Sequence, residues 1–190
     1  MASTESSLGR FTSIRVLVPG TGTRFRCGGL SVALQTARLL SRLRYTQLVT
    51  YRQRQSDRPF LDDLLQQDKS PEDVLWLVSW GFDVPLLLRR LKGRPVIYQA
   101  HSSGYGFDLP AGVPVLAVSR NTMGYWGDRA PRNPLFFLPN ALEPQWFERG
   151  ARHLALDSRS IDVLVQRRKS SDYVLSQLVP VLRAKGLRVE

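Results

Sequence analysis

The sequence predicts an α/β domain built on a parallel β-sheet with helices packed on its faces. Apolar segments of strand length alternate with amphipathic segments of helix length up to residue 150, which is the pattern of successive β-α-β units. Polar breaks containing glycine, serine or proline follow several of the apolar segments. Because parallel α/β sheets bind ligands beyond the carboxyl ends of their strands, functional residues are expected in those breaks.

Six strands and four helices are expected in this first domain, residues 12–150. The strands are expected near residues 14–18, 46–51, 73–78, 95–99, 114–118 and 135–138. The helices are expected over about residues 29–44, 59–67, 84–92 and 119–127. Pro59 suits the start of the second helix, and Ser119 suits the N-cap of the fourth. Helical spacing divides the first helix into an apolar face (Leu30, Leu34, Ala37, Leu40, Leu43) and a polar face (Ser31, Gln35, Arg38, Arg42).

The composition changes after residue 150. Residues 151–158 are expected to form a linker, followed by a strand that begins near Ser160, a helix over about 171–185 and a strand at 187–190. A single β-α-β unit cannot cover a sheet by itself. Residues 159–190 are therefore interpreted as the opening of a second domain whose remainder is not in this sequence.

The charge favours anionic partners. The chain of 190 residues has a net charge of +11 at pH 7, which attracts nucleotide phosphates, anionic lipid headgroups or nucleic acid. The basic residues are spread along the whole chain, without a basic stripe interleaved with aromatic residues, so specific nucleic-acid binding is not expected. Weak peripheral attachment of Arg38, Arg42 and Arg44 to an anionic membrane is a lesser hypothesis, and a simple solvated face is its alternative.

A cytoplasmic protein is expected, with a location at the cytoplasmic face of a membrane as the lesser hypothesis. No apolar run approaches the roughly 20 residues that a spanning helix needs, and the N-terminal segment lacks the apolar core of a secretory signal. The single cysteine, Cys27, cannot form a disulfide within the chain. A neighbouring arginine can lower the pKa of a thiol, but an unreactive loop residue is the favoured interpretation of Cys27.

The loop after the first strand, residues 19–29, has the features of a phosphate-binding loop. Gly28 and Gly29 stand where the first helix begins, and a helix N-terminus offers unpaired N–H groups and a partial positive charge. Arg24 and Arg26 belong to the same loop. The glycines are also compatible with nothing more than a tight turn from strand to helix.

Two common nucleotide-binding motifs do not fit this loop. The series Gly20-x-Gly22 would need a third glycine where Phe25 stands, and no acidic residue ends the second strand, so a dinucleotide site is disfavoured. A Walker A loop would need Lys and then Ser or Thr after Gly29, whereas Leu30 follows.

A histidine follows the fourth expected strand. His101 stands directly before a segment rich in glycine and serine, where it can hydrogen-bond a sugar hydroxyl or a phosphate near neutral pH. It is also compatible with a strand cap that bonds a backbone carbonyl. The loops expected to line a binding site are 20–28, 52–58, 80–84 and 101–112, in which Trp80 and Tyr105 suit a sugar or an anionic ligand.

The order of four segments resembles the family-4 retaining glycosyltransferases of the GT-B fold. These segments are the glycine loop that ends at Gly29 and residues 98–101, 116–120 and 137–147. The resemblance implies a Rossmann-like N-terminal domain that faces a second such domain, with the active site in the cleft between them. It also implies metal-independent transfer of a sugar from a nucleotide-sugar donor to a sugar or lipid-linked acceptor hydroxyl, with retention and without a further cofactor.

The resemblance also assigns roles to matching positions. Gly28 and Gly29 would approach the donor diphosphate and sugar, and His101 would contact the transferred sugar as the catalytic candidate. Ser119 and Asn140 match motifs that shape the loops of the cleft, although Ser119 also suits a helix cap and Asn140 a turn.

In the C-terminal segment, the resemblance implies a role for Arg167, Arg168 and Lys169 in binding the diphosphate. The family separates its arginine and lysine by about five residues, so the adjacent Lys169 departs from the pattern. The family's pair of glutamates eight positions apart, which binds the donor, is absent. The expectation is therefore an acceptor-side half that is inactive or nearly so alone, with the incomplete unit free to contact a second copy or another subunit. A non-catalytic binding or scaffold protein with half of the fold is the alternative.

Overall fold

The computed structural model describes residues 10–79, 81–103, 105–140, 142, 144–150, 160–166 and 170–190. The chain divides into two compact units, Met1–Glu143 and Pro144–Glu190. The expected first domain extends further, to residue 150, and the expected linker at 151–158 lies outside the described residues. Each unit is considered by itself.

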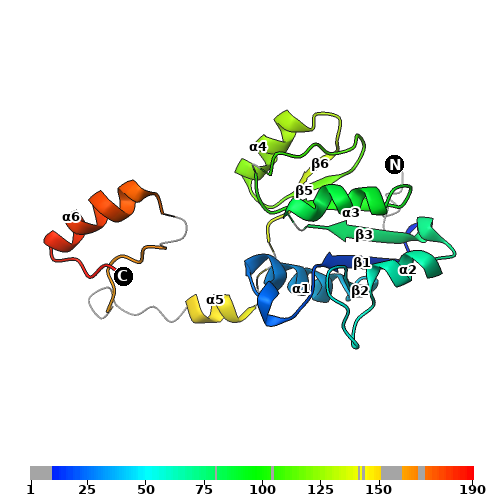
Figure 1. Ribbon diagram of the computed structural model, residues 1–190, viewed down its shortest axis with the longest axis horizontal. Coiled ribbons are helices and arrows are strands. Elements are labelled where there is room, and N and C mark those ends of the chain that lie inside the picture. The colour runs from blue at the N-terminus through cyan, green and yellow to red at the C-terminus, as the bar shows by residue number, and fades with distance from the viewer. Residues whose placement is uncertain are drawn as a thin grey trace, which may run out of the picture. The chain divides into compact units, whose positions relative to one another are not determined.

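The first unit contains a six-stranded, all-parallel sheet, which confirms the predicted fold class (Figure 1). Its strands are β1 (Ser13–Val18), β2 (Tyr45–Thr50), β3 (Val74–Val78), β4 (Val96–Ala100), β5 (Val115–Ala117) and β6 (Leu135–Phe137). The spatial order is β2-β1-β3-β4-β5-β6. From β1 the chain adds β2 on one side and β3 to β6 on the other, so the topological switch point lies between β1 and β3. Such a switch point leaves a crevice at the carboxyl ends of the strands, as in other Rossmann-like sheets.

Four helices connect these strands, close to their predicted positions. They are α1 (Gly28–Leu40), α2 (Leu61–Gln67), α3 (Val84–Arg90) and α4 (Arg120–Arg129). The 3₁₀ turns η2 (Thr23–Phe25), η3 (Pro71–Asp73) and η4 (Gly81–Asp83) lie in the loops. Two cores form: Leu30 and Ala33 of α1 pack against Val16 on one face of the sheet, and residues of α2, α3 and α4 join Leu17, Trp76 and Tyr98 on the other.

The buried face of α1 differs from the predicted one. Leu34 is 40% exposed and Leu43 is 65% exposed, whereas Gln35 is buried. The helix ends at Leu40, so Leu43 and Arg42 follow it and take no part in its periodicity. The side of the helix that packs on the sheet contains Leu30 and Ala33, with Ala37 partly buried. Because the alanines are small, the helix can lie close to the sheet on this side, and Leu34 then points away from it.

An ion-pair cluster ties α2 to the sheet. The Asp68 carboxylate, at the C-terminal end of α2, accepts hydrogen bonds from Arg15 of β1 at 2.7 Å and from Arg94, which precedes β4, at 2.6 Å. All three side chains are largely buried. The Arg15 guanidinium also lies 4.9 Å from the centre of a Trp76 ring. The shared carboxylate therefore joins three elements at the amino-terminal side of the sheet.

The second unit contains the expected helix but, within the described residues, no strand at either of the two expected positions. It contains α5 (Pro144–Gly150), which the sequence did not predict, a π-helical turn η6 (Val174–Leu178) and α6 (Val179–Ala184). Val163 and Val189 form a single parallel bridge in place of two strands. Arg188 donates side-chain hydrogen bonds to both carboxylate oxygens of Asp162 and holds the pKa of that carboxyl down at about 2.

Candidate binding pocket

A pocket of about 490 Å³ opens at the carboxyl ends of the strands of the first unit, beside the switch point. Its lining residues follow four neighbouring strands of the sheet. They are Cys27 and Gly29 after β1, Arg52 after β2, Ser79, Gly81, Phe82 and Asp83 after β3, and His101, Ser102 and Tyr105 after β4. The site thus lies where the parallel sheet predicts a ligand.

The N-terminal end of α1 forms one wall of this pocket. Cys27 occupies the N-cap position with extended backbone, and its side chain makes no cap hydrogen bond within the described residues. The first turn of the helix contains no acidic residue. The first N–H groups of α1 are therefore left for solvent or for a ligand, and the helix dipole favours an anionic one.

His101 forms another wall and offers a free ring nitrogen. Its Nε2 atom is buried and has no hydrogen-bond partner in the part of the chain that the structure describes. Burial lowers the pKa of His101 below its ordinary value of 6.5, while a side-chain hydrogen bond with Asn140 acts in the opposite direction. The imidazole is therefore neutral at pH 7, and Nε2 can donate or accept a hydrogen bond according to its tautomer.

A buried carboxylate organises the side of the pocket nearest β2. Asp83 is 8% exposed, and its Oδ2 accepts a hydrogen bond of 2.7 Å from the Tyr51 hydroxyl. Its Oδ1 accepts one from Nη2 of Arg52. Burial and the Asp83 carboxylate raise the pKa of Tyr51, and the same carboxylate raises that of Arg52. Tyr51 therefore stays a hydrogen-bond donor and Arg52 stays cationic.

Aromatic rings form the rim. Phe82 is 80% exposed and packs edge-to-face on Tyr105 with ring centres 5.0 Å apart. Tyr105 in turn stacks on Phe107, which contacts the buried Trp126. Gly81 supports this arrangement, because its φ is +37° and an added Cβ atom would lie 3.2 Å from the Tyr105 ring.

The structure brings three of the predicted site residues together and separates the others from them. Gly29, His101 and Tyr105 line the pocket. The described residues Gly28, Arg24, Arg26, Ser119 and Asn140 are not among its lining residues, although Asn140 bonds His101. Arg167, Arg168, Lys169 and Trp80 lie outside the described residues.

Two of the separated residues have local roles. The Arg24 guanidinium lies 4.5 Å from the centre of the Phe25 ring. The Ser119 Oγ accepts a hydrogen bond of 3.1 Å from the Thr122 backbone N–H and caps α4. Gly28 has no atom within 4 Å of the position that a Cβ would take, so the packing there does not require a glycine.

Sequence reasoning did not single out Arg52, Ser79, Asp83 or Ser102. The loops 52–58 and 80–84 were expected to line a site, but Arg52 and Asp83 are 31 residues apart in the chain. Their pairing depends on the strand order, in which the loops after β2 and β3 lie on either side of β1. The Asp-Val-Pro sequence at the start of α3 was the only local signal, and it reads as an ordinary helix start.

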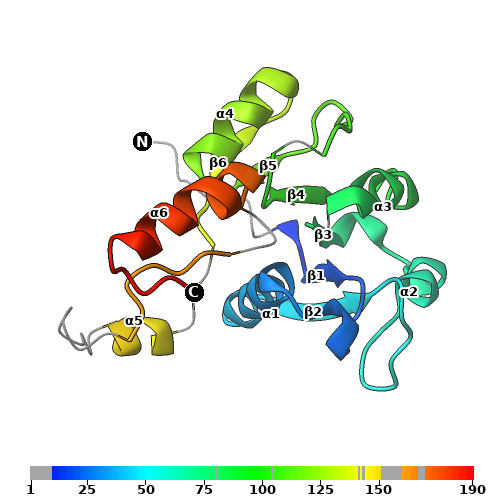
Figure 2. The same cartoon turned by 60° about the vertical axis from the view of Figure 1, so that its left-hand side comes forward.

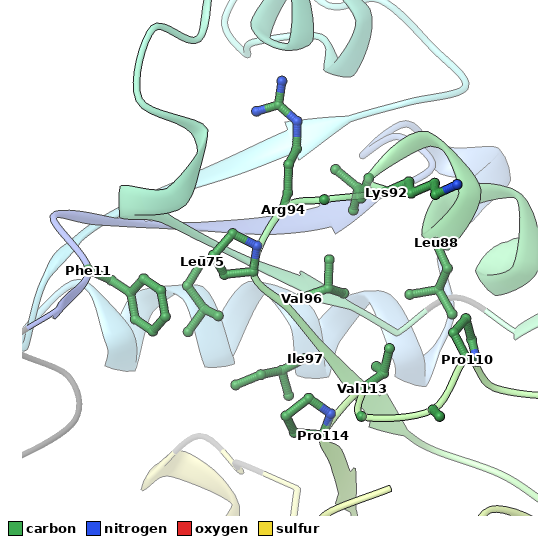
Figure 3. Close-up of a pocket in the computed structure, with 15 residues that line it drawn as sticks. Phe11, Leu75, Leu88, Lys92, Arg94, Val96, Ile97, Pro110, Val113 and Pro114 are labelled. Atoms are coloured by element: carbon green, nitrogen blue, oxygen red, sulfur yellow. The ribbon is translucent and has the colours of Figure 1, made fainter. Parts of the chain in front are cut away.

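A second pocket of about 530 Å³ lies at the opposite end of the strands, near the amino ends of β4 and β5 (Figure 3). Its walls are mainly apolar, with Leu75, Val96, Ile97 and Val113 among them. Arg94, one of its two cationic residues, is already bound to Asp68. The smaller pocket therefore has the richer chemistry, because it combines a free imidazole nitrogen, an exposed cation and a helix N-terminus.

Within the described residues, no group of three or more His, Cys, Asp or Glu side chains is placed to hold a metal ion. No helix of that part of the chain is both long enough and apolar enough to cross a membrane.

No protein-family model matches the chain, and no curated protein sequence matches it. The function must therefore be argued from the pocket.

Proposed function

We propose that this pocket is the acceptor-side wall of a glycosyl-transfer site and that the chain supplies the acceptor-binding half of a retaining glycosyltransferase. The observation that carries the proposal is that the start of α1 and His101 line one pocket. Together they offer N–H groups for a phosphate beside a neutral hydrogen-bonding group for a sugar hydroxyl. A nucleotide-sugar carries both a phosphate and sugar hydroxyls close to its reacting carbon.

The other walls suit a carbohydrate. Phe82 and Tyr105 offer apolar ring surface against which a sugar ring can pack, while Ser79 and Ser102 offer hydroxyl groups. Mostly apolar walls with a few convergent polar groups are typical of small-molecule sites. In this proposal, His101 hydrogen-bonds a hydroxyl of the transferred sugar through Nε2 and fixes the orientation of that sugar for attack by the acceptor.

Calorimetric titration tests the proposal. The purified chain is titrated with UDP, UDP-glucose, GDP and GDP-mannose at two salt concentrations. One nucleotide-sugar is expected to bind more tightly than its own nucleotide. Replacing His101→Ala should remove that difference, and His101→Gln should keep part of it, because glutamine retains a hydrogen-bonding group. Equal affinities for each nucleotide and its nucleotide-sugar would contradict the proposal and favour a non-catalytic nucleotide-binding protein.

A further inference from the structure

Arg52 is held in one orientation by a buried carboxylate, both of whose oxygens are already hydrogen-bonded. Its Nη2 atom donates to Oδ1 of Asp83, and the other oxygen of Asp83 is bound by the Tyr51 hydroxyl. Asp83 is buried and Tyr51 is 7% exposed. The carboxylate is thus fixed from behind, and it fixes the guanidinium in turn.

The guanidinium of Arg52 has donors that no described residue uses. It carries five N–H donors in a planar fork, and its bond to Asp83 is the only one that this group makes with the described residues. The side chain is 55% exposed while it lines the pocket. An arginine whose remaining fork faces a pocket is a site for a planar or tetrahedral oxyanion.

The surroundings of Arg52 favour an anion further. The pocket also contains the uncapped start of α1. Asp83 is the only acidic residue among the described lining residues, and both of its oxygens are already bound to donors. A ligand therefore meets N–H donors from two directions and no unpaired carboxylate.

We propose that Arg52 is an anion-binding and specificity-determining residue of this pocket, oriented by Asp83 and Tyr51, and that the ligand of the pocket carries a phosphate group. The assignment of that ligand to glycosyl transfer rests on the proposed function. The phosphate belongs either to a phosphorylated sugar acceptor or to the diphosphate of a nucleotide donor, and the two are separable by experiment.

Ligand binding in the pocket can be measured through the reactivity of Cys27. It is the only cysteine of the chain, it is exposed and it lines the same pocket. The rate of its alkylation by iodoacetamide is measured with increasing mannose 6-phosphate, UDP, mannose or uridine at constant ionic strength. A phosphate-bearing compound is expected to slow alkylation at concentrations at which its phosphate-free counterpart does not.

Variants then assign the effect to Arg52. Arg52→Gln is expected to weaken the protection by about 10- to 100-fold in ligand concentration, and Arg52→Lys to weaken it less, because the charge stays and the fork is lost. Tyr51→Phe should weaken the protection less than Arg52→Gln does. The double variant should show the same protection as Arg52→Gln alone, because Tyr51 acts through Arg52. Arg54→Gln is the matched control, since Arg54 is an exposed arginine of the same loop that pairs with Asp63 outside the pocket.

Each outcome decides the matter. Arg52-dependent protection by mannose 6-phosphate supports the inference and places the phosphate on the acceptor, whereas Arg52-dependent protection by UDP alone supports it and places the phosphate on the donor. Protection by neither compound, or protection that Arg52→Gln leaves unchanged in a folded protein, overturns it. If mannose 6-phosphate protects but no nucleotide-sugar binds in calorimetry, the role of Arg52 stands and the proposal of glycosyl transfer fails.

Discussion

His101 makes the free energy of unfolding depend on pH. Burial lowers the pKa of His101 from its ordinary value of 6.5. As the pH falls through 6.5, the imidazole therefore binds a proton in the unfolded chain while it stays neutral in the folded chain. Unfolding then takes up a proton, so this residue lowers the free energy of unfolding as the solution becomes more acidic than pH 6.5. The effect is absent well above that pH, where the imidazole is neutral in both states.

The expected result is a difference between pH slopes. The urea midpoint of the wild-type chain should fall more between about pH 7.5 and about pH 5.5 than that of His101→Gln, which has no group that titrates there. Equal falls in both proteins would show that the pKa of His101 is not lowered by folding.

Gly81 is the position at which the backbone itself shapes the pocket. Its positive φ disfavours any residue with a Cβ, and the Tyr105 ring leaves little room for one. Gly81→Ala is expected to lower the free energy of unfolding by about 1–3 kcal/mol and to weaken ligand protection of Cys27 by displacing Tyr105. Gly112 also has a positive φ but has open space around it, so Gly112→Ala should cost stability and leave the protection unchanged. Identical effects of both substitutions on protection would refute the role of Tyr105 contact.

At the scale of elements, Asp68 attaches α2 to the sheet through ion pairs with two largely buried arginines. Asp68→Asn keeps the shape of the side chain but leaves Arg15 and Arg94 largely buried without an anion. Breaking one partner of a buried pair costs about 3–5 kcal/mol, and the urea midpoint should fall accordingly. Asp63→Asn, in the same helix but in an exposed pair with Arg54, should change the midpoint little. A small effect of Asp68→Asn would mean that water reaches the two arginines.

Ser119 tests whether a motif residue acts as a cap or as a ligand contact. Its Oγ bonds the Thr122 N–H at the start of α4, and it is not among the residues that line the pocket. Ser119→Ala should therefore cost about 1 kcal/mol of stability without altering ligand protection of Cys27, and Ser119→Asp should restore most of the stability. Weaker protection at unchanged stability would instead identify a ligand contact.

Across the whole molecule, the sequence predicted what depends on local pattern and missed what depends on strand order. The buried strand β3 is a continuous apolar run, and only Ser13 and Arg15 interrupt the apolar residues of β1, so the positions of both strands could be predicted. The predicted face of α1 differs from the buried one because alanine is common both in cores and on surfaces, so that Ala33 gave no signal while the larger Leu34 was expected in the core. The pair of Arg52 and Asp83 was unreadable, because only the β2-β1-β3 order brings the two loops together.

The two-unit division leads to a prediction about the whole chain. Every member of both hydrophobic cores of the sheet lies in the first unit, and so does every described residue that lines the pocket. A fragment of residues 1–143 should therefore unfold in one cooperative transition, and a phosphate-bearing ligand that protects Cys27 in the full chain should protect it equally well in the fragment. Arg52→Gln should abolish the protection in both proteins to the same extent. A fragment that folds but binds such a ligand more weakly would mean that residues after Glu143 contribute to binding, whereas a fragment that does not fold would mean that the sheet depends on them for stability.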